Sequence, residues 1–164
     1  MRVLAFFLLF VVNVFAIDAT MEIVKQAQKL PTIRVENITP AGGDKDTGGK
    51  VATMLAGDLK VSGHFEAFSV ASDGKVDYIT LRQSGVDMLA TVSLSRGFDG
   101  VIAEYTLYDV NAQKSVESKM FSVKEAARYP FLAHKIAISV NDYLGAPKID
   151  WMDRFVVVAK QKSK

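Results

Sequence analysis

Two glycine pairs and a lysine lie close together in the stretch AGGDKDTGGKVAT, residues 41–53, and they suggest phosphate chemistry. A phosphate-binding loop of the form G-x-x-x-x-G-K-[ST] wraps backbone amides around the phosphates and places a hydroxyl on the magnesium ion. Here five residues, not four, separate Gly43 from Gly49, and Val51 stands where the Ser or Thr is required. We therefore expect a strand-to-helix loop, where an anion would find only the generic field of a helix N-terminus.

Metal and acid–base chemistry have few candidate residues. The chain has no cysteine and two histidines, His64 and His134, so a zinc site would lack enough ligands. A hydrolase is an alternative, but the G-x-S-x-G motif is absent and the nearest phrase, RQSGVD, has no leading glycine. Asp44, Asp46 and Asp109 fall in expected turns or strand ends, where Asp bonds to nearby backbone. We expect no catalytic residue, no metal and no cofactor.

Three aromatic residues on neighbouring predicted strands, Tyr105, Tyr108 and Phe121, have the type needed to stack on RNA bases. No basic aromatic motif accompanies them, and the net charge of the chain is only +2. We expect no nucleic-acid partner and interpret these rings as cross-strand packing.

The first residues, MRVLAFFLLFVVNVFA, have the pattern of a secretory signal peptide. Arg2 precedes an apolar run, and Val14 and Ala16 occupy the −3 and −1 positions of a small-residue cleavage site. The run is about 10–12 residues, short of the ~20 that span a bilayer. We expect residues 1–16 to be removed by cleavage after Ala16, which leaves no integral membrane segment and places the protein in the periplasm. An uncleaved anchor is the alternative.

The remaining chain has the length and apolar content of one globular domain, since 49% of all residues are hydrophobic. Alternating residues predict a strand over 32–38, and helical spacing follows it, with Asp46 or Thr47 as the N-cap and Ser62-Gly63 as the stop. A strand over 64–70 completes a βαβ-like unit, and residues 76–85 allow a short helix.

The second half predicts a meander. Strands over 87–95, 101–110 and 115–123 are joined by short turns, so they should be antiparallel. A long helix follows over about 124–144, with Pro130 setting its start or a kink, and a last strand over 154–159. The fold class is α+β: a two-layer arrangement with a mixed sheet of about five strands packed by two main helices.

Several segments, in this order, resemble the amino-terminal domain of the TolB family, the periplasmic component of the Tol–Pal system. GDLKVSGHFEAF is similar to the D-L-x-x-S-G-x-F segment through Asp58, Leu59, Ser62, Gly63 and Phe65. SGVDMLATVSL is similar to the G-[IV]-D strand through Gly85, Val86 and Asp87, and YTLYDV to the strand after it. ARYPFLAHKIAISVNDYLGA resembles the closing helix, through Arg128, Tyr129, Ala133, His134 and Gly145. IVKQAQKLPTI and the closing helix look closest to the Campylobacter/Helicobacter-type branch.

The resemblance implies two helices on a five-stranded mixed sheet over residues 31–148, and a strand-forming arm over residues 17–30 that engages TolA. The positions that match the partner-binding arm are Ile17, Asp18, Ala19, Thr20, Met21, Glu22, Ile23 and Val24. Their own pattern is more helical than extended. The family continues into a β-propeller that contacts Pal; residues 149–164 would lead towards it, so we expect a fragment or truncated product and carry over no Pal contact.

The sequence therefore favours a non-enzymatic, monomeric periplasmic adaptor of the Tol–Pal system, which supports outer-membrane integrity, cell division and import-related protein contacts. The alternative is a periplasmic module that binds a small ligand or lipid beneath the meander. Its only support is the adaptable side chains of Met88 and Met120 on an apolar sheet.

Overall fold

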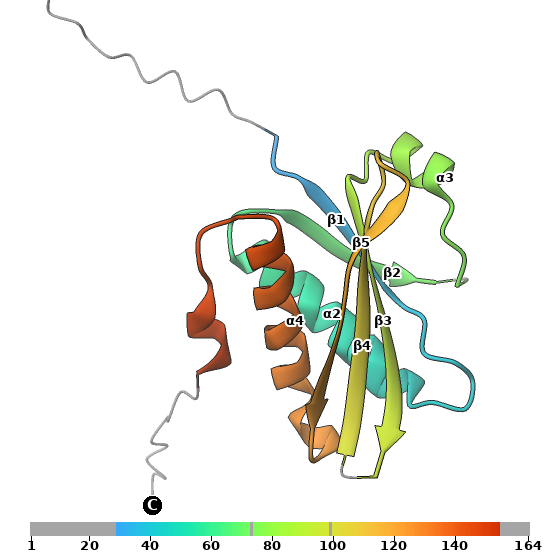
Figure 1. The fold of residues 1–164 in the computed structure, drawn as a ribbon, viewed down its shortest axis with the longest axis vertical. Coiled ribbons are helices and arrows are strands. Elements are labelled where there is room, and N and C mark those ends of the chain that lie inside the picture. The colour runs from blue at the N-terminus through green and yellow to red at the C-terminus, as the bar shows by residue number, and fades with distance from the viewer. Residues whose placement is uncertain (1–28, 73, 99, 155–164) are drawn as a thin grey trace, which may run out of the picture.

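The computed structural model describes residues 29–72, 74–98 and 100–154. Five strands form one mixed sheet in the order β2-β1-β3-β4-β5. β1 (Thr32–Asn37), β2 (Glu66–Ala71) and β3 (Met88–Gly97) are parallel. β4 (Gly100–Asp109) and β5 (Lys114–Val123) complete an antiparallel meander with β3. Two long helices, α2 (Lys45–Val61) and α4 (Tyr129–Tyr143), cover one face of this sheet, as Figure 1 shows. The predicted α+β fold with two main helices is confirmed.

The helices bury apolar stripes against the sheet. Val51, Leu55 and Leu59 recur at helical spacing on α2 and are fully buried, as are Ile136 and Val140 on α4. They meet the inward-facing residues of the strands in one main core cluster. α2 lies on the parallel strands, and α4 lies beside it on β4 and β5 (Figure 1).

A smaller layer covers part of the other sheet face. The short helix α3 (Tyr78–Gln83) joins β2 to β3 and packs Leu81 against Leu89, with Val86 and Val110 beside them. The crossover before α3 is tied to β1, since Ser72 Oγ donates to the buried Glu36 carboxylate at 2.5 Å. β3 is therefore covered on both faces, and the Ser72–Glu36 bond extends this cover to part of β1.

Three predicted boundaries need correction. The N-cap of α2 is Asp44, not Asp46 or Thr47. β2 begins at Glu66, so His64 lies in the turn before the strand. The predicted helix over 124–144 begins only at Tyr129, after a 3-10 turn (Ala126–Arg128).

Pro130 causes the late start of α4, because proline fits the first turn, where its missing N–H leaves no bond unmade. Gly145 has a φ of +68° just beyond the end of α4, as predicted for the stop. A 3-10 turn, η2 (Asp150–Asp153), then packs on α4. The strand predicted over 154–159 extends beyond the described residues.

Candidate functional site

The predicted partner-binding arm, Ile17 to Val24, and the cleavage position after Ala16 lie outside the described residues. The description begins at Lys29, directly before β1. The part of the predicted site with known geometry is therefore the base of the arm, residues 29–32. What holds this base determines how the arm is attached to the domain.

The base is hydrogen-bonded to the beginnings of two other strands. Thr32 N donates to Asp87 Oδ2 at 2.8 Å, and Asp87 N donates back to Thr32 O at 2.9 Å. Glu66 N donates to Pro31 O at 3.0 Å. The three parallel strands thus start from one shared set of bonds, and a charged acceptor such as Asp87 strengthens the bond that it receives.

The matched motif residues explain this convergence. Gly63 and Gly85 adopt φ values of +76° and +72°, the left-handed region that glycine enters without strain, and each redirects the chain into the next strand. Ser62 Oγ donates to Leu59 O at 2.6 Å and accepts from His64 N at 3.2 Å, which fixes the end of α2. Two of the quoted motifs therefore build the base of the arm.

The sequence places Asp87 in a motif but does not predict its hydrogen bonds to Thr32. The available signal was an acidic residue directly before the apolar strand MLATV. It was insufficient because the bonded partner, Thr32, is 55 residues away in the chain.

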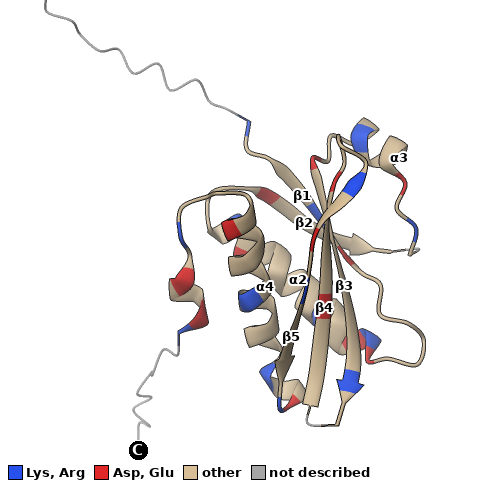
Figure 2. Cartoon of the chain, in the orientation of Figure 1, with Lys and Arg blue, Asp and Glu red and all other residues tan. Residues whose placement is uncertain are grey.

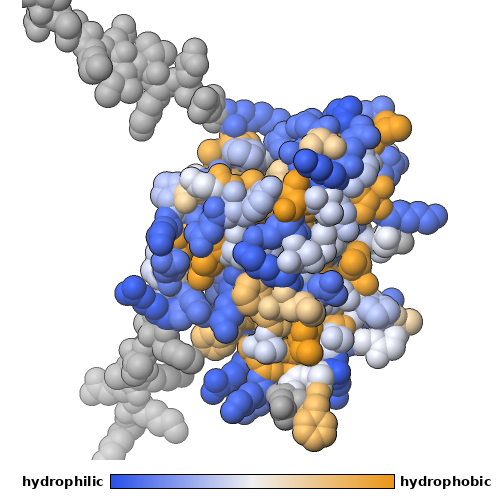
Figure 3. Space-filling model, viewed as in Figure 1, coloured by the Kyte–Doolittle hydropathy of each residue, from blue (hydrophilic) through white to orange (hydrophobic). Residues whose placement is uncertain are grey.

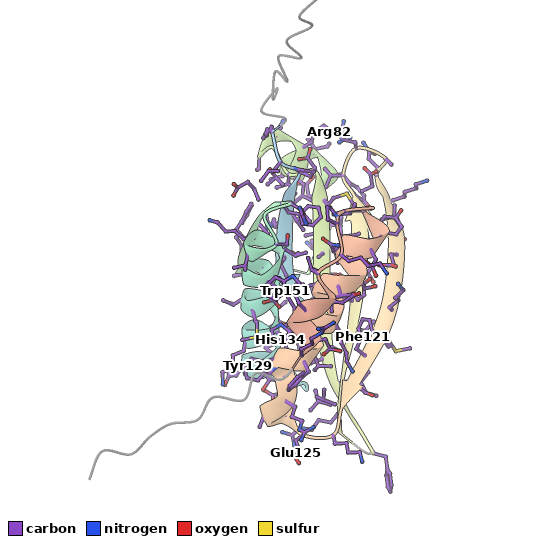
Figure 4. All side chains as sticks on the ribbon, turned by 90° about the vertical axis from the view of Figure 1, so that its left-hand side faces the viewer. Arg82, Phe121, Glu125, Tyr129, His134 and Trp151 are labelled. Atoms are coloured by element: carbon purple, nitrogen blue, oxygen red, sulfur yellow. The ribbon has the colours of Figure 1, made fainter. Side chains whose placement is uncertain are left out.

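His134 forms a polar side-chain contact that links the two long helices. Its Nδ1 lies 2.8 Å from Asp58 Oδ2 on α2, and Phe131 packs edge-on against its ring. Figure 4 shows His134 on α4, away from Phe121 on the β5 side. Burial raises the pKa of Asp58 above its ordinary value, more than the bond to His134 lowers it. The other histidine, His64, packs edge-on against Phe65.

Within the described ranges, no group of three or more His, Cys, Asp or Glu side chains is placed to hold a metal ion. Asp109, singled out for acid–base chemistry, caps a turn, because its Oδ1 accepts from Ala112 N at 2.8 Å. The turn interpretation of this residue is confirmed.

The glycine-rich stretch serves packing and capping. Thr47 donates to Asp44 through its N–H at 3.0 Å and its hydroxyl at 2.8 Å, and these bonds lower the pKa of Asp44. A Cβ on Gly48 would come within 2.5 Å of Asn37 Oδ1 and Thr39 Oγ1. Glycine at this position lets the first turn of α2 lie against the end of β1.

A cavity of about 590 Å³ lies beside this turn, at the carboxyl ends of β1 and β2. Its lining is mostly small and polar, and includes Asn37, Thr53, Ser69 and Ser72, with Lys45 as the charged group. In open α/β sheets this edge is a common place for ligands. Here Asn37 Nδ2 already donates to Lys45 O at 3.0 Å, so one of its polar groups is occupied by the protein.

Two of the three aromatic rings considered for RNA stacking pack against each other across neighbouring strands, as predicted. Tyr105 and Phe121 stack across β4 and β5, with centroids 6.2 Å apart and planes 7° apart. Tyr108 lies on the other sheet face, beside the α3 cluster, so the three rings form no common platform. The buried Tyr105 hydroxyl donates to Glu117 and lies 2.7 Å from Ser139 Oγ; burial, then Glu117, raises its pKa.

The two methionines considered for ligand binding face opposite sides of the sheet. Met88 belongs to the main core beneath the helices. Met120 is paired with Glu104 on the far face and is 70% exposed. They therefore line no shared pocket, which removes the observation that supported a ligand site beneath the meander.

The fold and the arm base define a class: a two-layer α+β domain whose parallel strands start from one hydrogen-bonded point. The sequence profile described as the TolB amino-terminal domain matches residues 19–116. The chain belongs to this family.

Curated relatives carry the name Tol-Pal system protein TolB. One from Wolinella succinogenes is 45% identical over 98% of this chain, and one from Helicobacter hepaticus is 41% identical over 93%. The chain spans 39% and 36% of these two proteins. The Campylobacter/Helicobacter-type resemblance thus agrees with these relatives, and a protein from Campylobacter jejuni is 27% identical over 99% of the chain.

Solved structures support the fold. TolB from Acinetobacter baumannii superposes with a TM-score of 0.58 at 19% identity, covering 76% of this chain and 30% of its own. A PelC dodecamer from Paraburkholderia phytofirmans gives 0.50 at 18% identity, covering 72% and 90%. Among the described residues, the structure has no helix with the length and hydropathy needed to cross a membrane.

Proposed function

We propose that this chain is a non-enzymatic periplasmic adaptor of the Tol–Pal system, and that it acts by reversible protein–protein contact. The arm over residues 17–24 carries the contact, with a TolA-like protein as its partner. An extended segment can add a strand to the sheet of its partner, where main-chain bonds supply affinity. Membership of the TolB family supports the system to which the protein is assigned.

The observation that carries the proposal is the anchored base of the arm. Asp87 and Glu66 bind residues 31 and 32 at the starts of three strands. A segment attached to such a base has a defined origin on the domain, which limits the entropy lost when the arm binds. The base also offers a partly exposed apolar side chain, since Leu30 is 37% exposed.

Capture of the TolA carboxy-terminal domain by the purified chain tests the proposal. The chain is compared with a variant that lacks residues 17–24 and with one in which these eight residues are shuffled at constant composition. We expect both variants to lose capture while their thermal unfolding stays unchanged. Equal capture by all three chains would reject the role of the arm.

A further inference from the structure

β5 forms one edge of the sheet, and no other described strand pairs with its outer side. β5 is the last strand of the sheet, ten residues long, and among the described strands it pairs only with β4. An open edge of this kind is a template for another strand unless charges or bulges protect it. Glu117 and Lys119 protect the middle of the strand, as their side chains form an ion pair of 2.6 Å. The last four residues of β5, from Met120 to Val123, have no charge.

A groove runs beside these last residues of β5, between β5, α4 and η2. It consists of two adjoining cavities of about 530 and 360 Å³, which share Lys135 and Asp153 in their linings. Phe121 of β5 and Ile138 of α4 form apolar walls in the larger cavity. Figure 4 looks onto this side, with Phe121 on the strand next to α4 and Trp151 of η2 on the other side of the helix. Figure 3 shows hydrophobic surface exposed between hydrophilic groups on the face that contains α4.

The two ends of the groove carry opposite charge. Asp142 and Asp150 line the larger cavity, whereas Lys124 and Arg128 line the smaller one. In Figure 2 acidic residues lie on η2 and near the end of α4, and basic residues lie where β5 leads into α4. From Arg128 to Asp142 the helix rises about 21 Å. This length matches a strand of about six or seven residues at ~3.3 Å per residue.

We propose that this groove is a docking site for an extended segment of a partner protein, which adds as a sixth strand to the edge of β5. Backbone bonds to β5 supply part of the affinity, and alternate apolar side chains of the segment contact Phe121 and Ile138. Charge complementarity sets its ends: basic residues lie beside Asp142 and Asp150, and acidic residues beside Lys124 and Arg128. This site is separate from the arm, and it gives the adaptor a second contact.

The probe for this test is the fluorescein-labelled peptide EEVTVTVKK, measured by fluorescence polarisation with the purified chain. Peptides EEVTVTVEE and KKVTVTVKK keep the central strand but place a repulsive charge at one end. We expect each to bind roughly tenfold more weakly, the size of effect that a few exposed charge pairs produce. Equal binding of all three peptides, or of none, would overturn the proposal.

Two double variants locate the site. In Asp142→Lys with Asp150→Lys, both changes are at exposed positions, and we expect the preference to change from EEVTVTVKK to EEVTVTVEE. The matched control is Asp46→Lys with Glu104→Lys, two exposed carboxylates that lie outside the linings of the groove, and we expect the original preference to remain. The same shift in both variants would mean that net charge, not the groove, binds the probe.

Backbone methylation distinguishes strand addition from other binding modes. Two versions of EEVTVTVKK carry N-methyl groups at alternate central positions, one on the valines and one on the threonines. One edge of an extended peptide faces β5, so one version should lose binding and the other should keep it. Equal affinity of both versions contradicts strand addition. A dimer of the chain in sedimentation that the probe dissociates would make a second copy the occupant and overturn a partner segment.

Discussion

The parallel part of the sheet and the meander differ in how they are covered. β1 and β3 have α2 on one face. On the other face the α3 cluster covers Leu89 of β3, and the buried Glu36 of β1 is held by Arg34 and by Ser72 of the crossover. β5 has a helix on one face only and no neighbour on its outer side among the described elements. The parallel part is thus suited to hold the base of the arm in place. In the meander, the outer edge of β5 has no partner among the described elements.

The largest expected effect compares two residues on the same sheet face. Leu89→Ala removes a fully buried side chain beneath α3, and we expect a loss of about 2–4 kcal/mol in the free energy of unfolding, measured with urea. Met120→Ala changes a side chain that is 70% exposed, and we expect a change within about 0.5 kcal/mol. Similar values for both variants would contradict the difference in coverage.

A second prediction concerns the polar contact beneath the meander. Tyr105→Phe leaves the half-buried Glu117 and the buried Ser139 without the phenol hydroxyl, and we expect a loss of about 1–2 kcal/mol. Tyr108→Phe, which lacks this contact, is the control and should be close to neutral. In an ultraviolet titration Tyr105 should ionise after the other tyrosines, because burial and Glu117 raise its pKa. Ionisation of all tyrosines together would reject this contact.

The third prediction weakens the base of the arm. Asp87→Ala removes the acceptor for Thr32 N, and we expect a loss of about 1 kcal/mol with faster hydrogen exchange at Thr32. Asp87→Asn retains an oxygen acceptor and should restore most of the protection. If exchange at Thr32 is unchanged in Asp87→Ala, the bond contributes nothing to the base.

The smallest expected effect is a pH dependence of the free energy of unfolding. It arises at the contact between Asp58 on α2 and His134 on α4. Because burial raises the pKa of Asp58 above 3.8, the folded state holds this proton more tightly than the unfolded state. The contribution of Asp58 to stability is therefore complete below pH 3.8 and declines as the pH rises through the raised value. Asp58→Asn should remove this decline, in denaturation curves recorded at several pH values. An unchanged pH slope would show that Asp58 has an ordinary pKa.

The sequence predicted the elements with strong local patterns. The meander has short turns and regular alternation, and both helices have apolar stripes and glycine stops, so their existence and order followed from local residues. The N-cap was misassigned because Gly48 lies against Asn37 and Thr39, a contact that positions the helix start and that local residues do not reveal. Capping candidates one to three residues apart cannot be ranked without that contact.

Less of the candidate site could be predicted from the sequence. Asp87 was recognised by resemblance, but the bonds of Asp87 and Glu66 to residues 31 and 32 depend on the sheet order β2-β1-β3. The groove beside β5 combines residues from the meander, α4 and η2, and no periodic pattern connects these segments.

The position of β1 between two parallel neighbours has a mechanical consequence. A pull on residues 29–31 along the axis of β1 would load the hydrogen bonds to β2 and β3 in shear, so many bonds share the force at once. An edge strand peeled from its end would instead lose its bonds one after another. The arm is therefore joined to the domain at the strand best placed to bear tension.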